Sequence, residues 1–213
     1  MTMNGDDVLL RIRGSQICRD KPLGPALPHE PRPVLQMGPN ARVLIAGQAP
    51  GTRVHASGQP FTDPSGGRLR QWLGVDAETF YDPENFAIIP MGFCFPGLTS
   101  KGADLPPRRE CAPAWRREVL ALMPKIELVI CLGAHAMRWH MGSHFDGSVD
   151  TAVRKWRDGL RLKPAVLPLP HPSWRNSGWL RRNPWFEEDV LPILRGKVAR
   201  LTASQLAACG PPV

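Results

Sequence analysis

The apolar residues of the chain gather in four short continuous runs rather than in strictly alternating patterns. Each run is rich in Leu, Ile or Val, and loop or turn residues follow each one. Continuous apolar runs of this length are typical of strands that are buried on both faces, as in a parallel sheet. The sequence therefore predicts four strands, at Arg42–Gly47, Phe86–Met91, Leu128–Gly133 and Ala165–Leu169.

Candidate helices lie between these runs and after the last one. Pro107 and Pro184 stand where the first turn of a helix tolerates proline. Alternating strands and helices imply right-handed crossovers, so we expect an α/β fold with three α/β/α layers around a four-stranded, mainly parallel sheet. The predicted helices are Gly66–Leu73, Pro107–Leu122, Ala134–Met141, Thr151–Arg157 and Trp185–Leu194.

The first forty residues have a different composition. The stretch KPLGPALPHEPRPVLQMGPN contains too many prolines and glycines for a helix or a central strand. We therefore expect residues 1–40 to form a Pro/Gly-rich arm that either wraps the surface or stays mobile, and residues 41–213 to form a single domain.

Composition narrows the class of protein only a little. The 42% of hydrophobic residues are ordinary for a globular protein, no apolar run could span a bilayer, and the N-terminus does not resemble a secretory signal. We expect a cytoplasmic monomer with no membrane partner. The formal net charge of +8 fits either a merely basic surface or a polyanionic partner such as nucleic acid.

Two loops that follow predicted strands carry the candidate chemistry. After the first run comes Gly47-Gln48-Ala49-Pro50-Gly51, which alone is best explained as an ordinary turn between a strand and a helix. The sequence then continues as GQPFTDPSG. Here Phe61 is either a core residue or the stacking face of a base pocket, and Asp63 either caps the next helix or lies near a sugar.

The loop after the fourth run reads PHPSWRN. His171 is held between two prolines, which fixes its direction, although a lone histidine is more often structural than catalytic. The residues that follow suit a loop that enters DNA, wedges the base stack and holds phosphate; they are Ser173, Trp174, Arg175 and Asn176. Arg181 and Arg182 fit phosphate contacts and a solvated helix start equally well.

Taken together, GQAPG, GQPFTDPSG and HPSWRN resemble the uracil-DNA glycosylase superfamily over roughly Arg42 to Arg195, and are closest to its bacterial family-4 and family-5 types. The resemblance implies a four-stranded parallel sheet and DNA containing uracil as the partner. It also implies that the base is flipped out and its N-glycosidic bond hydrolysed, which leaves an abasic site. Asp63, His171 and Gln48 are the implied catalytic residues. The implied substrate contacts are Gly47, Ala49, Pro50, Gly51, Phe61, Met91 and Gly92.

Three departures from the family pattern bear on these roles. Ala49 stands where the classical family has an aspartate, and Gln48 stands where family 4 has a glutamate. An amide cannot act as a base, which leaves Gln48 to orient a water. The resemblance to family 5, which lacks that carboxylate and has an aspartate just after its Phe-Thr pair, implies Asp63 as the catalytic carboxylate. No asparagine follows the second run, so backbone groups around Met91 and Gly92, or a residue from another loop, must read the base.

The cysteines raise the question of a cofactor. The resemblance to family 4 implies a [4Fe-4S] cluster held by four cysteines, for which only Cys18, Cys94 and Cys111 are candidates here. We expect the cluster to be lost, with no cofactor and no metal, and Cys131 to be a buried core thiol.

Three other functions remain open from the sequence. The first is a nucleic-acid-binding protein that kept the fold and lost the chemistry, and the second is a glycosylase for other deaminated bases. The third is a nucleotide-dependent hydrolase or transferase, but the chain lacks the phosphate-binding glycine motifs that such enzymes use.

Overall fold

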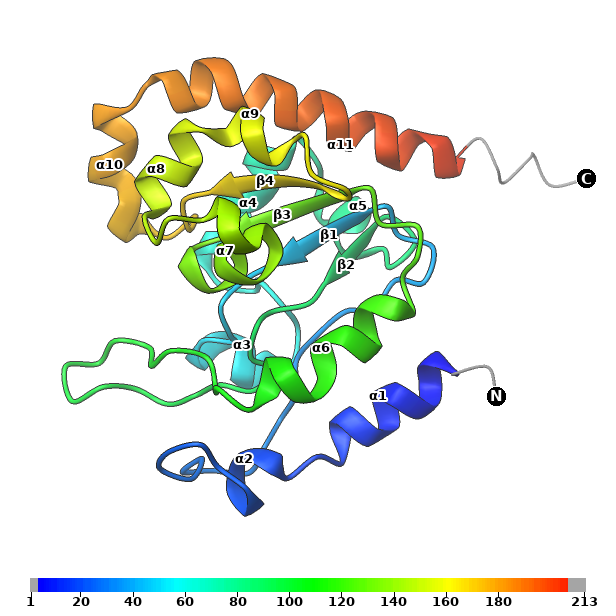
Figure 1. Cartoon of the computed structure of the whole chain (residues 1–213), viewed down its shortest axis with the longest axis vertical. Coiled ribbons are helices and arrows are strands. Elements are labelled where there is room, and N and C mark those ends of the chain that lie inside the picture. The colour runs from blue at the N-terminus through cyan, green and yellow to red at the C-terminus, as the bar shows by residue number, and fades with distance from the viewer. Residues whose placement is uncertain (1–3, 207–213) are drawn as a thin grey trace, which may run out of the picture.

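The computed structural model describes residues 4–206 and has the expected α/β architecture (Figure 1). Its central sheet contains four strands that all run parallel, in the order β2-β1-β3-β4. Each predicted run contains one strand, and nearly every strand residue is buried, as the continuous apolar pattern requires. The strands are β1 (Val43–Ala46), β2 (Phe86–Ile88), β3 (Leu128–Leu132) and β4 (Ala165–Leu169).

The strand order explains two features of the sequence. Pro168 cannot donate to a ladder, but it is tolerated because β4 forms an edge of the sheet. The second run extends to Met91, whereas β2 ends at Ile88. Beyond Ile89, the amide groups of Met91 and Gly92 donate to the carbonyls of Gly47 and Gln48, so this stretch packs beside the loop after β1.

Helices cover both faces of the sheet and complete the three layers (Figure 1). Right-handed crossovers place α4 and α5 on one face and α6 to α9 on the other. The α-helices are α1 (Gly5–Arg13), α2 (Ile17–Asp20), α3 (Thr52–Ser57), α4 (Pro64–Leu73), α5 (Ala77–Tyr81), α6 (Cys111–Ala121), α7 (Ala134–Met141), α8 (Val149–Arg154), α9 (Trp156–Gly159), α10 (Ser177–Arg182) and α11 (Leu191–Leu206). Short turns of other helix types are η1 (Gly142–His144), η2 (Trp174–Asn176) and η3 (Phe186–Val190).

The predicted helices need several corrections. The single helix predicted at Thr151–Arg157 is instead the two short helices α8 and α9. Helix α6 begins at Cys111 rather than at Pro107, because Arg108 instead reaches Glu110 and the carbonyl of Pro25. The last predicted helix, Trp185–Leu194, is a π-helical turn followed by the longer α11. The short helices α3 and α5 were not predicted, since each has only one buried residue and no apolar periodicity to reveal it.

The N-terminal segment packs against the body of the protein. Its Pro/Gly-rich stretch after residue 20 is free of helix, as predicted, but α1 and α2 precede it. Val8 and Ile12 of α1 join the main hydrophobic core, and Arg11 forms an ion pair with Glu118 of α6 at 2.5 Å. Gln36 pairs antiparallel with Ile88 and so covers the free edge of β2.

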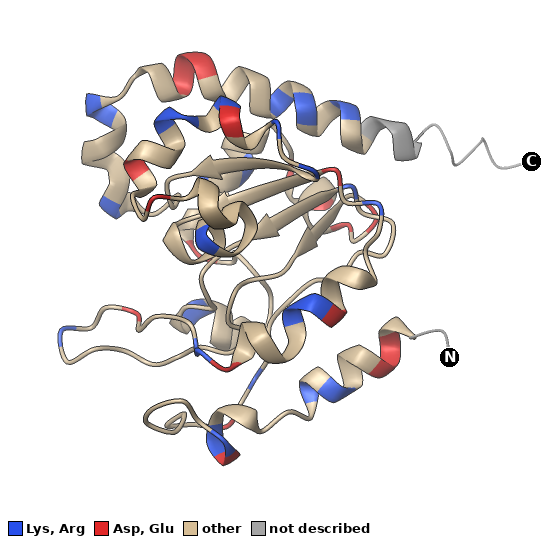
Figure 2. Cartoon of the chain, in the orientation of Figure 1, with Lys and Arg blue, Asp and Glu red and all other residues tan. Residues whose placement is uncertain are grey.

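Basic side chains recur along α10 and α11, at the top of the molecule in Figure 2. The acidic turn η3, which contains Glu187, Glu188 and Asp189, lies between these two helices. None of the helices between residues 4 and 206 combines the length and apolarity that a bilayer-spanning helix needs.

Candidate functional site

The loops at the carboxyl ends of the strands enclose a cleft of about 650 Å³. A smaller pocket of about 90 Å³ opens from it toward the sheet. Ligands of open α/β sheets bind at this edge. The residues that line both spaces come from the loops after β1, β2 and β4; they are Gln48, Ala49, Pro50, Gly51, Asp63, Ser65, Asp104 and His171.

The size of the smaller pocket limits its occupant. A cavity needs roughly 10–15 Å³ of such space for one water molecule, so the 90 Å³ of this pocket corresponds to only a handful of non-hydrogen atoms. That is the scale of a single small ring with its substituents. The larger cleft outside has room for the sugar and phosphates attached to such a ring.

The loop after β1 forms one wall of the pocket. Gly47, Ala49, Pro50 and Gly51 all line it, as does Gln48. The side-chain amide of Gln48 donates a hydrogen bond to the carbonyl of Leu105 at 3.2 Å. This wall is thus joined to the segment that follows β2.

Phe61 supplies an aromatic face to the same pocket in a strained backbone conformation. Its φ is 55°, a region that non-glycine residues rarely adopt and that concentrates at functional sites. Tyr81 holds the strained segment, because its hydroxyl donates to the carbonyl of Pro60 at 2.9 Å and to that of Phe61 at 3.2 Å. The Phe61 ring lies close to Gly47, where an added Cβ would meet it at 3.7 Å.

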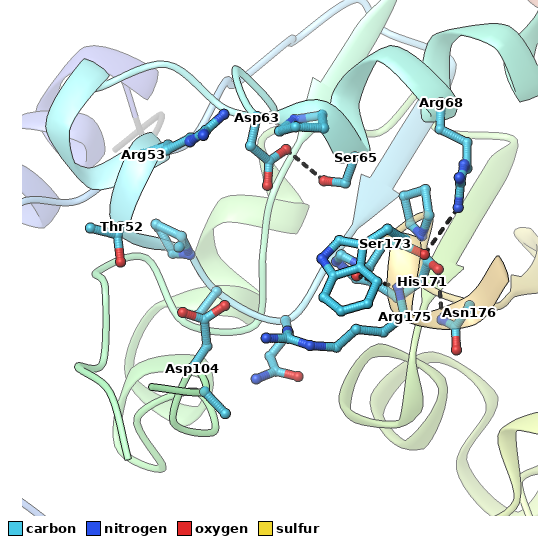
Figure 3. A pocket seen from close by; sticks show the side chains of 18 of the residues that line it. Thr52, Arg53, Asp63, Ser65, Arg68, Asp104, His171, Ser173, Arg175 and Asn176 are labelled. Atoms are coloured by element: carbon cyan, nitrogen blue, oxygen red, sulfur yellow. Dashed lines mark hydrogen bonds between the residues drawn. The ribbon is translucent and has the colours of Figure 1, made fainter. Parts of the chain in front are cut away.

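Asp63 lines the pocket and also caps helix α4. Its Oδ1 accepts hydrogen bonds from the Ser65 hydroxyl at 2.6 Å and from the Gly66 amide at 3.3 Å (Figure 3). The helix cap that the sequence suggested is therefore present, and the same carboxylate also forms part of the pocket wall. The cap fixes the direction of the side chain.

His171 enters the pocket from the loop after β4. Burial lowers the pKa of His171, as does nearby Arg175, while Asp63 and Asp104 act in the opposite direction. The ring is therefore neutral at neutral pH and has one N–H to donate. Asn176 supports the loop, because its side-chain amide donates to the carbonyl of His171 at 2.7 Å.

The residues after His171 line the outer cleft. Trp174 is 73% exposed, with the guanidinium carbon of Arg175 5.6 Å from the centre of its ring. The loop is tied to helix α4, because Arg68 donates to the carbonyl of Ser173 at 3.1 Å (Figure 3). A large, solvent-facing aromatic side chain on a fixed loop is suited to insertion between stacked bases.

Phe61, Asp63 and His171 thus meet around one pocket, although they come from opposite ends of the sequence. A model of the Uracil DNA glycosylase superfamily matches residues 35–195, which is more than half of the chain. The chain belongs to this superfamily. Membership indicates a DNA glycosylase that acts on damaged bases, and DNA as its partner.

Some residues expected from the glycosylase resemblance lie away from the pocket. Met91 and Gly92 do not line it, and their amide groups are already engaged with the loop after β1. Pro90 and Ile88 line it instead from the end of β2. Arg181 and Arg182 are exposed in the last turn of α10, outside the lining of the cleft.

Three charged residues that line the cleft were missed in the sequence. Arg53, Arg68 and Asp104 line the cleft, and Asp104 also lines the pocket. Arg53 and Arg68 lie in helices, where a charged residue is usually just part of a solvated face. Asp104 lies in an irregular loop, and no spacing pattern there would have shown that it faces Asp63.

The cysteines considered for an iron–sulfur cluster, Cys18, Cys94 and Cys111, are buried free thiols. Cys18 and Cys94 share a small apolar cluster, and the Sγ of Cys111 accepts a hydrogen bond from the Phe93 amide at 3.3 Å. Burial raises the pKa of both Cys94 and Cys111 to about 12, which keeps the thiols neutral. Among the described residues, no three His, Cys, Asp or Glu side chains are arranged to hold a metal ion.

Cys131 lies in the centre of β3 and is fully buried, as expected of a core thiol. Burial raises its pKa to about 12, so this thiol is a packing residue of the glycosylase fold.

Proposed function

We propose that this protein is a monofunctional uracil-DNA glycosylase, which hydrolyses the bond between uracil and deoxyribose and leaves an abasic site. The observation that carries the proposal is the pocket of about 90 Å³ that Phe61, Asp63 and His171 share. An aromatic face, a fixed carboxylate and a neutral imidazole are the groups that base excision requires. Family-4 and family-5 bacterial enzymes are the types it resembles most.

The reaction begins with extrusion of the base, since the glycosidic bond is inaccessible inside a stacked duplex. Exposed Trp174 is the wedge that fills the vacated space, with Arg175 beside it. Ser173 and Asn176 shape the loop through hydrogen bonds to the Arg175 amide and the His171 carbonyl. Arg181 and Arg182 on nearby α10 supply positive charge to the flanking phosphates.

Cleavage builds positive charge on the sugar and negative charge on the departing base. Asp63, held by its two hydrogen bonds, stabilises the positive sugar. Neutral His171 donates its N–H to the uracil carbonyl, where negative charge develops. Gln48 has its amide nitrogen tied to Leu105, which leaves its carbonyl oxygen to orient a water.

The base is recognised by its shape and by the backbone. Phe61 stacks on the ring, while Gly47, Ala49, Pro50 and Gly51 form a close backbone wall around it. Met91 and Gly92 act indirectly, because their amide groups hold the carbonyls of Gly47 and Gln48 in place.

A glycosylase for other deaminated bases is the second candidate. Ile88 and Pro90, where β2 reaches the pocket, offer no side-chain hydrogen-bond donor that would read one pyrimidine edge. Such a wall discriminates weakly between deaminated bases, each of which carries a ring carbonyl in place of an amino group. Hypoxanthine and xanthine are therefore the alternative substrates.

The proposal also covers the domain bounds, the compartment, the oligomeric state and the need for a cofactor. We propose that residues 41–213 form the catalytic domain, that the enzyme acts as a cytoplasmic monomer, and that it needs neither cofactor nor metal. The paired residues Asp63 and His171 supply all the charge stabilisation that the reaction asks of the protein.

The test is excision from labelled oligonucleotides that contain uracil, hypoxanthine or xanthine, followed by alkaline cleavage at abasic sites. We expect uracil to be removed fastest, from both single strands and duplexes. Cleavage of only the purine lesions would support the second candidate. Full binding of DNA without any abasic product would show a binding protein that has lost the chemistry.

A further inference from the structure

A second carboxylate, Asp104, faces the pocket from a hairpin-like loop between β2 and α6. The loop is closed by an antiparallel bridge between Leu98 and Asp104 and by a hydrogen bond from the Thr99 amide to the Ala103 carbonyl at 2.7 Å. The Leu105 amide donates to Gly97 at 3.0 Å. Residues 97–105 are named the β2–α6 hairpin below. These contacts hold Asp104 at the base of the hairpin, where it meets the pocket.

The loop after β1 fixes the position of this carboxylate. Gln48 donates to the carbonyl of Leu105, the residue next to Asp104, at 3.2 Å. A Cβ placed on Gly51 would lie 3.6 Å from Oδ2 and 3.9 Å from Oδ1 of Asp104. The carboxylate therefore lies within van der Waals reach of Gly51 in the loop after β1.

Asp63 and Asp104 approach the pocket from different sides (Figure 3). Their electrostatic effects meet at the same group, since both raise the pKa of His171 against the effect of burial. A substrate sugar that enters between Phe61 and His171 would thus pass between two carboxylates. One carboxylate is enough to stabilise the positive charge that develops on the sugar. The second carboxylate is therefore available for another role in the reaction.

The carboxylates of Asp63 and Asp104 differ in the hydrogen bonds that they already accept. Asp63 Oδ1 accepts from both Ser65 and Gly66, and these bonds are part of the helix cap. Within residues 4–206, no hydrogen bond or ion pair is formed by the side chain of Asp104, which is exposed to the cleft. A carboxylate has about four lone-pair sites, and none of those on Asp104 is taken up by a hydrogen bond within residues 4–206.

We propose that Asp104 is a further catalytic residue, the general base that accepts a proton from the attacking water, while Asp63 remains a fixed charge. The water oxygen bonds to C1′ of the sugar as the bond from C1′ to the base nitrogen breaks. The electron pair of that bond leaves with the base, whose carbonyl His171 stabilises. One water proton passes to Asp104 and then to the departing base or solvent.

This assignment rests on the proposed glycosylase function and is tested after it. Single-turnover excision from single-stranded uracil DNA is measured for the wild type, Asp104→Asn and Asp104→Ala. We expect both variants to slow the chemical step by about 10²- to 10⁴-fold. Their affinity for the same strand carrying uncleavable 2′-fluoro-2′-deoxyuridine should stay within about threefold of the wild type, since the base pocket itself is intact.

A small carboxylate supplies the readout that a merely structural residue would not move. Formate should restore part of the rate of Asp104→Ala, because it fits the vacated space and accepts the proton. It should leave the wild type unchanged. The matched control is Lys101→Ala, which alters an exposed residue of the same hairpin and should keep full activity.

The possible results separate the two claims. A wild type that excises no base from any of the strands overturns the proposed function itself. A wild type that is active, with Asp104→Asn equally fast, leaves the proposed function standing and refutes the role of Asp104. Loss of activity without formate rescue of Asp104→Ala also refutes the proton-accepting role.

Discussion

The two walls that carry the carboxylates are built in different ways. Asp63 begins helix α4, where a hydroxyl and an amide hold it and the helix holds the loop with His171 through Arg68. Asp104 belongs to the β2–α6 hairpin, whose contact with the first loop is one hydrogen bond from Gln48 to Leu105. One wall is fixed by regular structure, and the other by a few contacts between loops.

The difference matches the two tasks that hydrolysis needs. A charge that stabilises a transition state works best when it is preorganised and does not move, as at a helix cap. A group that takes a proton must keep open lone pairs and access to water, as on an exposed hairpin. The variants below separate these tasks, and they are ordered from the largest expected effect to the smallest.

The largest effect should come from removing the fixed charge alone. Asparagine is as good an N-cap as aspartate, so Asp63→Asn keeps the start of α4 and removes only the charge. We expect single-turnover excision to fall by about 10²- to 10³-fold, with an unchanged thermal midpoint. The matched control, Ser65→Ala, leaves the charge in place and should stay within about tenfold of the wild type.

Equal rates for Asp63→Asn and the wild type would show that the cap is the whole role of Asp63. In that case the charge stabilisation would belong to Asp104, and the contrast between the two walls would fail.

The next prediction concerns the packing of helix α4 against the segment that contains Phe61. A Cβ at Gly66 would lie 1.8 Å from the carbonyl oxygen of Phe61, a clash with backbone. Gly66→Ala should therefore cost about 3 kcal/mol of unfolding free energy or more, measured by chemical denaturation. At neighbouring Gly67 a Cβ would meet nothing within 4 Å, so Gly67→Ala should stabilise helix α4 by about 0.5–1 kcal/mol. Similar stabilities for the two variants would contradict this packing.

The buried pair of Arg116 and His140 makes the free energy of unfolding depend on pH. Buried Arg116 donates to the carbonyls of Ile89 and Pro90, at 3.0 and 2.9 Å, and to Nε2 of His140 at 2.6 Å. Burial, reinforced by the charge of Arg116, lowers the pKa of His140 to about 3. His140 takes up a proton near pH 6.5 in the unfolded chain but not in the folded protein. The free energy of unfolding therefore decreases as the pH falls below that value.

We therefore expect the wild type to lose about 3 kcal/mol more than His140→Gln between pH 6.5 and pH 4. Glutamine can still accept from Arg116 but does not titrate. Denaturant unfolding at the two pH values measures the difference. His144→Gln, in the exposed turn after α7, is the control and should follow the wild type. Parallel losses in wild type and His140→Gln would exclude His140 as the source.

The smallest effect concerns entry to the site. Trp174 is largely exposed, so Trp174→Ala should not change stability. It should slow excision from duplex DNA by about tenfold, because a wedge offsets an unstacking cost of a few kcal/mol, and should spare single strands. Leu10→Ala, another exposed apolar residue but on α1, should change neither rate. Equal losses on both substrates would show that Trp174 is not a wedge.

The sheet was predictable because its signal is local. Four apolar runs gave four buried strands, and the alternation with helices gave parallel pairing. Helix α1 was missed because Val8 and Ile12 become buried only by packing against the rest of the fold. The start of α6 was misplaced because Pro107 fits a first helical turn, whereas Arg108 is held outside the helix by its long-range hydrogen bond to the Pro25 carbonyl.

The site was predictable only in part, for a related reason. Phe61, Asp63 and His171 lie in loops that follow strands, so the carboxyl edge of a parallel sheet brings them together. Asp104 depends on a hairpin bridge and on the hydrogen bond from Gln48, neither of which leaves a pattern in the sequence. The strained φ of Phe61 likewise becomes visible only in the folded chain.

The central claim is that one extruded uracil occupies the pocket with its sugar between the two carboxylates. A crystal structure with single-stranded DNA that carries 2′-fluoro-2′-deoxyuridine tests it directly. The uracil ring should stack on Phe61 with a carbonyl toward His171, and C1′ should face both Asp63 and Asp104. A uracil bound outside this pocket, or a C1′ turned away from both carboxylates, would contradict the account.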